Sequence, residues 1–272
     1  MRLLAAAAAL ALAVTCQVAC PSAWASSPAA PAAIALVGHK AGYILTLERV
    51  RGNDIVGASG TMGYEVVDAC DGWAVRQRLA MLITNSDGQD IEMVSDYTTF
   101  ESKDGLRLRF RMKQTTDDAV TSQTEGSATL RRTGGPGEAR YTVPKAAKVD
   151  LPAGTQFPMT HTVSLLHAAR DGKKFLSIPL FDGTGDSGAE DSSAVVLDWK
   201  QGAPTDHAAL AKLYSTRVRL AFFERKSGGI TPSYEVGMRY WENGVADDMQ
   251  MDFGDFVMRA KMQEFAVQPK KC

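Results

Sequence analysis

The stretch LRLRFRMK, residues 106–113, decides the fold class of this chain. Its apolar residues alternate strictly with arginine or lysine. Successive side chains of a strand point to opposite faces, so this alternation predicts a strand with one buried and one solvated face. One wet face is typical of antiparallel sheets. The residues on the apolar side are Leu106, Leu108, Phe110 and Met112.

The same alternation recurs along most of the chain from His39 onward. Asp-Gly or Asn-Gly steps lie between several of the runs, and such steps favour type I′ hairpin turns because both central residues need positive φ. RYWENGVADDMQMDF, residues 239–253, is the best single hairpin. The pattern predicts a mainly β protein. The further alternating runs are HKAGYILTL (39–47), STRVRLAFFE (215–224), SYEVGMRYWE (233–242) and DMQMDFGDFVMRAKM (248–262).

Two segments break the alternation and indicate short helices. FPMTHTVSLLHAARDG, residues 157–172, offers Thr160 as an N-cap and Gly172 as a stop, with apolar residues at helical spacing between them. PTDHAALAKLYS, residues 204–215, starts a second candidate helix at Thr205 or Asp206. Because strands lie on both sides of these segments, we expect a single domain over residues 39–272.

The first 25 residues have the features of a secretory signal peptide. An arginine precedes a long apolar run that ends in an AWA cleavage signal, so we expect cleavage after Ala25. Lipidation at Cys20 is the competing interpretation, although Gln17 stands where a lipobox prefers leucine. Residues 26–38 are rich in Ala and Pro and are expected to form an extended lead-in. No later stretch is long and apolar enough to span a bilayer, so we expect an exported chain without a transmembrane segment.

The charges of the chain are balanced. It carries 30 Lys and Arg against 31 Asp and Glu, spread along its length. A protein that binds nucleic acid or a membrane surface by electrostatics usually has a basic patch or tail. The sequence therefore indicates neither partner.

Removal of the signal peptide would leave two cysteines, Cys70 and Cys272. An even pair in an oxidising compartment predicts a disulfide, and two free thiols are the alternative. The bridge would close a loop of roughly 200 residues, for which the chain-entropy model gives about 5 kcal/mol as an upper bound. It would also hold a chain end that would otherwise fray.

Motifs that carry chemistry are weak. GTGDSG, residues 183–188, contains the Gly-Asp-Ser-Gly of chymotrypsin-like nucleophiles, but no upstream histidine stands in that family's sequence context. The same loop fails the EF-hand spacing, because the sixth position from Asp182 is Ser187 rather than glycine. His161 and His167 lie six apart, on different faces of the expected helix, which argues against a zinc pair. The sequence assigns no catalytic residue, no metal ligand and no cofactor.

Aromatic side chains in the expected strands are the better candidates for a binding site. If the sheet curls around a cavity, they would line an apolar pocket. Without a cavity they would simply fill the core. The candidate lining residues are Tyr43, Trp73, Tyr240 and Trp241.

Several longer motifs occur in order along the chain from about His39 to Cys272. They are HKAGYILTL, GTMGYEVVDACDGWAVRQR, ESKDGLRLRF, GTQFPMTHTVSLLHAARDGKKFLSIPLFDGTG and PSYEVGMRYWENGVADDMQMDFGDFVMRAKM, followed by the final cysteine. Together they resemble the EipB family of periplasmic cell-envelope integrity proteins of alphaproteobacteria. The resemblance implies a β-spiral, a long antiparallel sheet that curls into a broken barrel with a helix near one opening, similar to the periplasmic lipoprotein carriers. It implies a Cys70–Cys272 disulfide and carries over no catalytic residue. Phe253 departs from the pattern, where tyrosine is expected.

We therefore expect a non-enzymatic periplasmic protein that maintains the cell envelope. Its curled sheet would offer a groove or cavity to a lipid or other amphipathic ligand, or bind a periplasmic protein partner. A lipid or lipoprotein carrier is the first alternative. An envelope hydrolase, in which Ser187 and His161 would meet, is the second.

Overall fold

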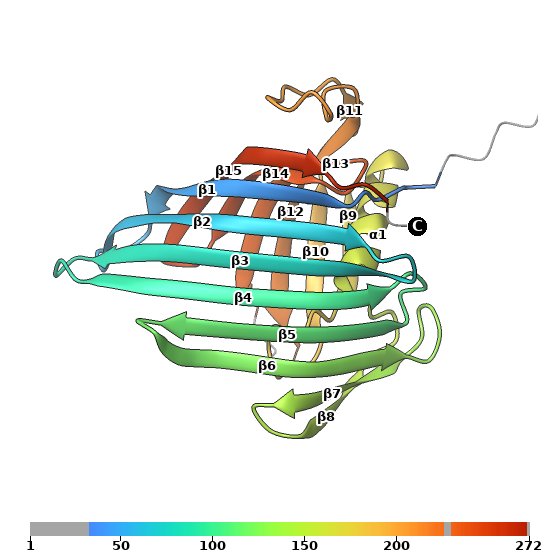
Figure 1. Ribbon diagram of the computed structural model, residues 1–272, viewed down its shortest axis with the longest axis horizontal. Helices are drawn as coiled ribbons and strands as arrows, with labels where there is room; N and C mark the ends of the chain where they lie inside the picture. The colour runs from blue at the N-terminus through green and yellow to red at the C-terminus, as the bar shows by residue number, and fades with distance from the viewer. Residues whose placement is uncertain (1–32, 226–229, 271–272) are drawn as a thin grey trace, which may run out of the picture. The chain divides into compact units, whose positions relative to one another are not determined.

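A computed structural model describes residues 33–225 and 230–270, which form one antiparallel sheet of 15 strands with one α-helix (Figure 1). The mainly β fold expected from the alternation is confirmed. The first eight strands are β1 (His39–Val50), β2 (Ile55–Asp68), β3 (Gly72–Asn85), β4 (Asp90–Ser102), β5 (Arg107–Thr116), β6 (Ala119–Leu130), β7 (Gly137–Val143) and β8 (Ala147–Leu151). After α1 (Pro158–Arg170) come β9 (Phe175–Leu180), β10 (Glu190–Val196), β11 (Lys200–Gln201), β12 (Tyr214–Glu224), β13 (Tyr234–Trp241), β14 (Ala246–Asp252) and β15 (Phe256–Val267).

The strand order explains the curl. The order is β8-β7-β6-β5-β4-β3-β2-β1-β15-β14-β13-β12-β10-β9, with β11 paired to β12. The first and last strands of the chain therefore pair in the middle of the sheet, while β8 and β9 form its two edges. Only the segment containing α1 connects these edges, and Gln156 in it makes a single parallel bridge to Leu180 of β9. The sheet thus brings its edges near each other without closing into a barrel.

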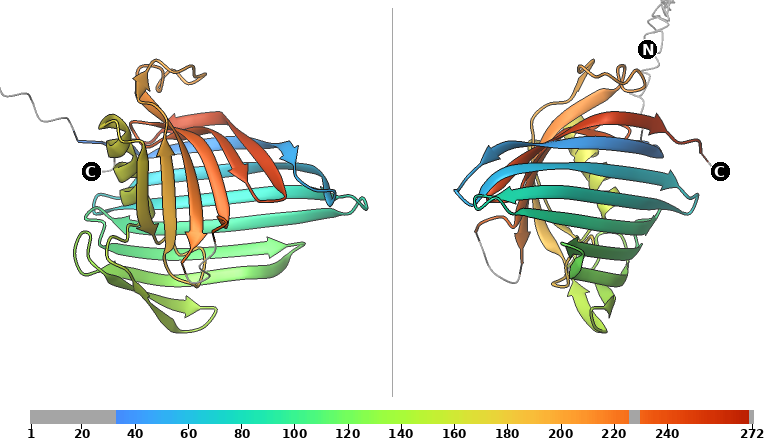
Figure 2. Two further views of the ribbon diagram at one scale, coloured as in Figure 1. Left: turned by 180° about the vertical axis from the view of Figure 1, so that it is seen from behind. Right: turned by 60° about the vertical axis from the view of Figure 1, so that its left-hand side comes forward.

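The curled sheet has two walls with an interior between them. β1–β8 form one wall, and β9, β10 and β12–β15 cross behind it, with α1 at one end (Figures 1 and 2). In β5, Leu108, Phe110 and Met112 are buried, whereas the basic residues between them are exposed. The alternation of residues 106–113 thus sets which face of the sheet is inside.

The largest apolar cluster lies between the two walls. Leu45 and Met258 in it are completely buried. Each large apolar side chain removed from water in this way contributes roughly 1.5–3 kcal/mol to folding. This cluster holds β1 and β15 against β13 and β14.

The helix ends where expected but begins earlier. α1 starts at Pro158, and its N-cap is Phe157, which provides no side-chain cap hydrogen bond. The expectation that Thr160 is the N-cap is wrong. The stop at Gly172 is confirmed, since this residue has φ +73° and its amide donates to Ala169 O at 3.1 Å. Such a left-handed glycine is a common helix terminator.

Two other local expectations need correction. The second helix expected over residues 204–215 is wrong, because turns precede β12 there. The hairpin at Asn243-Gly244 forms, but only Gly244 has positive φ, so the turn is not type I′. Positive φ at two successive residues occurs instead at Asp117 (48°) and Asp118 (62°), between β5 and β6. Aspartate accepts this conformation more readily than most residues.

Candidate functional site: a chamber inside the curled sheet

A cavity of ≈ 260 Å³, called the chamber below, lies between the two walls of the sheet. One side consists of β1, β2 and β3, the other of β13 and β14, and α1 contributes two residues. Its volume lies just below the usual range of ligand pockets, about 300–1,000 Å³, which favours a single chain over a bulky molecule. The lining residues are Tyr43, Met62, Tyr64, Val66, Gln77, Met159, Thr162, Tyr234, Val236, Met238, Tyr240, Gly244, Ala246, Met249 and Met251.

Strand periodicity and register place these side chains together. Tyr43 lies opposite Met62 across β1 and β2, and Tyr64 lies opposite Gln77 across β2 and β3. Directly opposed residues on one face of a sheet are close neighbours. On β13 every second residue from Tyr234 to Tyr240 faces the chamber. On β14 an irregularity at Asp248, with φ +47°, puts Ala246 and Met249 on the same side.

Methionine is the most frequent residue of the chamber lining. The thioether side chain is flexible and polarisable, and it adapts to irregular apolar shapes. The aromatic residues were expected from the sequence, but the methionines were missed. Their signal is the every-second spacing in MQM, residues 249–251. The five are Met62, Met159, Met238, Met249 and Met251.

The phenol groups of the chamber remain neutral. Burial raises the pKa of Tyr43, and the charge of Asp247 adds to this rise. Burial likewise raises the pKa of Tyr64 and of Tyr240. Tyr43 Oη donates to Ala246 O at 2.7 Å, which ties β1 to β14 across the interior. These tyrosines therefore act as hydrogen-bonding groups without charge.

A buried carboxylate positions α1 beside the chamber. Glu101 of β4, 1% exposed, accepts hydrogen bonds from Met159 N (2.7 Å), Thr160 N (2.9 Å) and Thr160 Oγ1 (2.5 Å). It thus accepts hydrogen bonds from backbone amides that an N-cap side chain would otherwise accept, and its charge lies at the positive end of the helix dipole. Burial raises the pKa of Glu101, and these hydrogen bonds oppose the rise. Met159 and Thr162 are held on the chamber side as a result.

The candidate hydrolase residues are not arranged as a nucleophile and base. His161 on α1 is 5% exposed, and its Nε2 lies 3.0 Å from Ser192 Oγ on β10. Burial lowers the pKa of His161 to about 4. Among the described residues no hydrogen bond joins Ser187 to a histidine. His161 and Ser192 form a buried pair that fixes α1 to the sheet.

The four aromatic residues proposed from the sequence lie in different surroundings. Tyr43 and Tyr240 line the chamber. Trp241 is completely buried in the core, with the Arg239 guanidinium 4.9 Å from its ring centre. Trp73 is partly buried beneath Lys103, whose Nζ lies 3.1 Å from the ring centre.

The sequence around GTGDSG forms a plug loop (residues 181–189) that enters another part of the interior. Its backbone oxygens accept hydrogen bonds from Tyr97, Thr124 and Tyr141 at 2.6, 2.5 and 3.0 Å, respectively. Gly183 has φ +81°, and a Cβ there would overlap the Phe110 ring. Apolar side chains of the described strands β4–β7 pack against this loop. No cluster of His, Cys, Asp or Glu that could hold a metal ion occurs among the described residues.

Cys70 lies at the turn between β2 and β3, and Cys272 lies outside the described residues. Cys70 has φ +70°, and its amide donates to Asp68 at 3.1 Å. The last strand reaches the same corner, since Gln268 N donates to Gly38 O at 2.7 Å. The disulfide stays a prediction, but the approach of the two chain segments is compatible with it.

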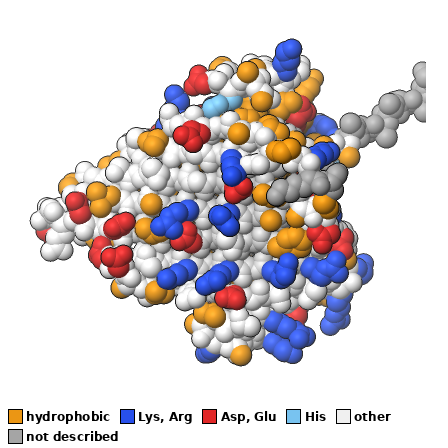
Figure 3. Space-filling view, viewed as in Figure 1, with side chains coloured by type: hydrophobic (Ala, Val, Ile, Leu, Met, Phe, Trp, Pro, Cys, Tyr) orange, Lys and Arg blue, Asp and Glu red, His pale blue; other side chains and the backbone are white. Residues whose placement is uncertain are grey.

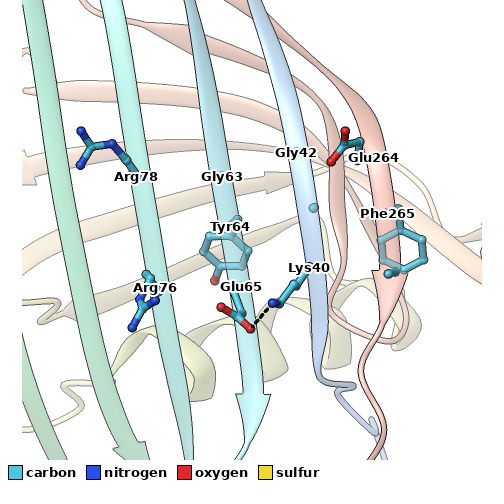
Figure 4. A pocket seen from close by; sticks show the side chains of 11 residues that line it. Lys40, Gly42, Gly63, Tyr64, Glu65, Arg76, Arg78, Glu264 and Phe265 are labelled. Carbon is cyan, nitrogen blue, oxygen red and sulfur yellow. Dashed lines mark ion pairs between the residues drawn. The ribbon is translucent and has the colours of Figure 1, made fainter.

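A second hollow, of ≈ 480 Å³, lies on the outer face over β1–β3 and β15 (Figure 4). Lys40 is paired with Glu65 at 3.1 Å, and Arg78 with Asp96 at 2.6 Å. Figure 3 shows basic and acidic side chains interspersed on this face. Charged, solvated groups are costly to dehydrate, so the smaller interior chamber is the better ligand site.

Comparison with known proteins gives the family. Residues 30–269 match the model of the EipB-like family. The chain belongs to the EipB-like family. A Brucella abortus (strain 2308) protein named cell envelope integrity protein EipB is 32% identical over 247 residues, which cover 88% of this chain and 87% of that protein. A crystal structure of a beta-barrel-like protein of a domain of unknown function, also from Brucella abortus, matches with a TM-score of 0.79 and 31% identity over 87% of this chain and 100% of that chain.

These findings place the EipB-like chain among the cell-envelope integrity proteins, and they indicate no enzyme family. The curled, unclosed sheet agrees with the beta-barrel-like description of the solved relative. In the part of the chain that the structure describes, no helix has the length and apolar character needed to cross a bilayer.

Proposed function

We propose that this envelope-integrity protein is a non-enzymatic periplasmic binding protein whose chamber holds one apolar chain of an envelope lipid or lipoprotein. The observation that carries the proposal is the chamber itself, an apolar cavity lined by methionine and neutral tyrosine between two walls of one sheet. A filled core would need no such space, because protein interiors normally pack without voids of this size.

The expected export and disulfide form part of the proposal. A signal peptide over residues 1–25 would take the chain to the periplasm, where disulfides form. Intact-mass measurement of the protein isolated from the periplasm would detect both the cleavage after Ala25 and the Cys70–Cys272 bridge. A bridge there would clasp β15 and the C-terminus to the β2–β3 turn.

The binding test uses a neutral fluorescent probe, N-phenyl-1-naphthylamine, whose emission rises in an apolar site. We expect saturable emission with the wild-type protein and a loss of binding in Met238→Trp, which fills the chamber. Leu82→Trp on the outward side of β3, 43% exposed, is the matched control and should bind as the wild type does. Equal binding by both variants would place the probe elsewhere, and no binding by the wild type would refute the proposal.

Transport of the bound chain between membranes is the second candidate function. The position of the chamber between two walls of an unclosed sheet favours it, since walls that are not joined into a barrel can move apart to admit a chain. Vesicles that carry a labelled lipid, mixed with unlabelled acceptor vesicles, would show faster transfer when the protein is added. Binding without acceleration would leave the protein a binding protein only.

A further inference from the structure

The lining of the chamber has no charged residue. None of the lining side chains among the described residues belongs to Lys, Arg, His, Asp or Glu. An isolated ion moved from water into such a site loses several kcal/mol of hydration unless a partner of opposite charge receives it. A charged group on a ligand would have no such partner here.

Two carboxyl groups behind the walls act on tyrosines of the chamber. Asp247 lies close enough to raise the pKa of Tyr43, and Glu101 has the same effect on Tyr64, in both cases after burial as the main cause. Asp247 is neutralised by Arg239, whose Nε and Nη2 donate to it at 2.7 and 2.8 Å. Glu101 receives only uncharged N–H and O–H donors. Neither carboxyl group offers an anion in the chamber a partner of opposite charge.

Uncharged hydrogen-bonding groups are present in the lining. Tyr64 and Gln77 face each other across β2 and β3. Neither side chain makes a hydrogen bond to another described residue. The phenol and the amide can both donate to a carbonyl or hydroxyl oxygen. Thr162 of α1 and Tyr240 of β13 add two further hydroxyl groups to the lining.

We propose that the chamber selects apolar chains whose first polar group is uncharged, such as an ester, an amide or an alcohol, and rejects free fatty acid anions. This inference rests on the proposed function, namely that the chamber binds an apolar chain. An acyl chain attached to a lipid or lipoprotein carries an ester or amide at that position, whereas a released fatty acid carries a carboxylate. The chamber thus distinguishes attached chains from hydrolysed ones.

The test compares three ligands with the same chain at about pH 8, where a fatty acid in water is ionised. Methyl laurate, lauryl alcohol and laurate each compete with N-phenyl-1-naphthylamine for the wild-type protein. We expect the ester and the alcohol to bind at least about tenfold more tightly than laurate. Equal affinity of laurate and the ester would overturn the inference while leaving the proposed function intact. Competition by none of the three would instead contradict the proposed function.

A charge inside the chamber should reverse the preference. Gln77→Lys provides the missing cation, so laurate should gain affinity and the ester should lose it. Gln89→Lys, in the exposed turn between β3 and β4, adds the same charge outside the chamber and should change neither affinity.

A second measurement uses only the wild-type protein and therefore tests the inference even if Gln77→Lys does not fold. The anionic probe 1-anilinonaphthalene-8-sulfonate should bind at least about tenfold more weakly than the neutral probe of the same ring system, and equal binding would contradict the inference.

Discussion

The same sheet encloses its interior in two ways, and the difference lies in what enters from the ends. Beside β5–β8 the plug loop (residues 181–189) brings Phe181 against Phe110, with ring centres 5.4 Å apart, and these rings pack the interior there. Between β1–β3 and β13–β14 only Gly244 of the lining belongs to a loop, and the chamber of ≈ 260 Å³ remains. A curled sheet of constant architecture is thus solid where a loop fills it and hollow where none does.

The side chains match these two roles. In the plugged part, aromatic rings meet edge to face, with Phe110 and Tyr141 also 5.4 Å apart, and this geometry adds to the stability from burial. In the chamber, methionines that can change their shape take the place of rings. The first arrangement suits a fixed core and the second a site that adapts to a chain.

α1 belongs to both parts. Phe157, immediately before the helix, packs in the plugged part, while Met159 and Thr162 line the chamber. Glu101 and the His161–Ser192 pair hold the helix to β4 and β10. A change in the position of α1 would therefore affect the packing of one part and the shape of the other.

The largest effect is expected in the plugged part. Phe181→Ala removes a completely buried ring that contacts other aromatic rings. Such a truncation leaves a cavity and costs about 3–5 kcal/mol. Urea unfolding should show this loss, whereas Met249→Ala in the chamber, where space already exists, should cost clearly less. Equal losses would mean that the two parts are packed alike.

Acid should loosen the attachment of α1 to β10. Burial lowers the pKa of His161 from 6.5 to about 4, so the unfolded chain binds the proton more readily. Stability present above about pH 6.5 is then lost as the pH falls toward 4, by up to about 3 kcal/mol. Unfolding free energies measured across this range should fall for the wild type.

The histidine responsible can be identified by substitution. His161→Gln should show a flatter pH profile than the wild type, because it lacks the titrating group. His207→Gln, a partly exposed histidine before β12, serves as the control and should keep the wild-type slope. An unchanged slope in His161→Gln would assign the acid sensitivity to other groups.

Loss of the Glu101 hydrogen bonds between α1 and β4 should destabilise the protein less, and its pH dependence should be opposite in sign to that of His161. Glu101→Gln replaces one accepting oxygen by a donor and should cost about 1–3 kcal/mol at neutral pH. Because burial raises the pKa of Glu101 in the folded protein, its contribution is fully present below the ordinary carboxyl value and is lost as the pH rises through the raised one. The gap between wild type and variant should therefore narrow as the pH rises, as measured by chemical denaturation. A constant gap would show that the carboxyl does not titrate in this way.

The predictability of the fold differs between these parts for a physical reason. Alternation in residues 106–113 identified the buried face of β5, and Gly172 identified the end of α1, because both depend on local geometry. The start of α1 was missed because its cap is Glu101, more than fifty residues earlier in the chain. Local sequence contains no signal for a cap supplied by another strand.

The candidate site was accessible from sequence only in part. Tyr43 and Tyr240 were expected on the basis of their place in strands, and both line the chamber. Trp241 is the next residue of β13 and lies on the other face of the strand, beside Arg239, where it is completely buried. The presence of aromatic residues in a strand thus did not tell which face borders the cavity. GTGDSG matched neither a nucleophile nor a calcium motif, and the three hydrogen bonds of the plug loop to distant strands could not be inferred from it.

The smallest effect on stability is expected from exchanging methionine for leucine in the chamber. Met238→Leu and Met249→Leu conserve volume, and such replacements usually cost less than about 1.5 kcal/mol. Leucine is branched and has fewer conformations, so the chamber should adapt less well to different chains. Affinities for alcohols of increasing chain length should therefore vary more steeply in the double variant than in the wild type. An equal exchange outside the chamber, at Met112 in β5, should leave this dependence unchanged. Identical dependence in all three proteins would show that methionine flexibility does not distinguish the chamber from the plugged part.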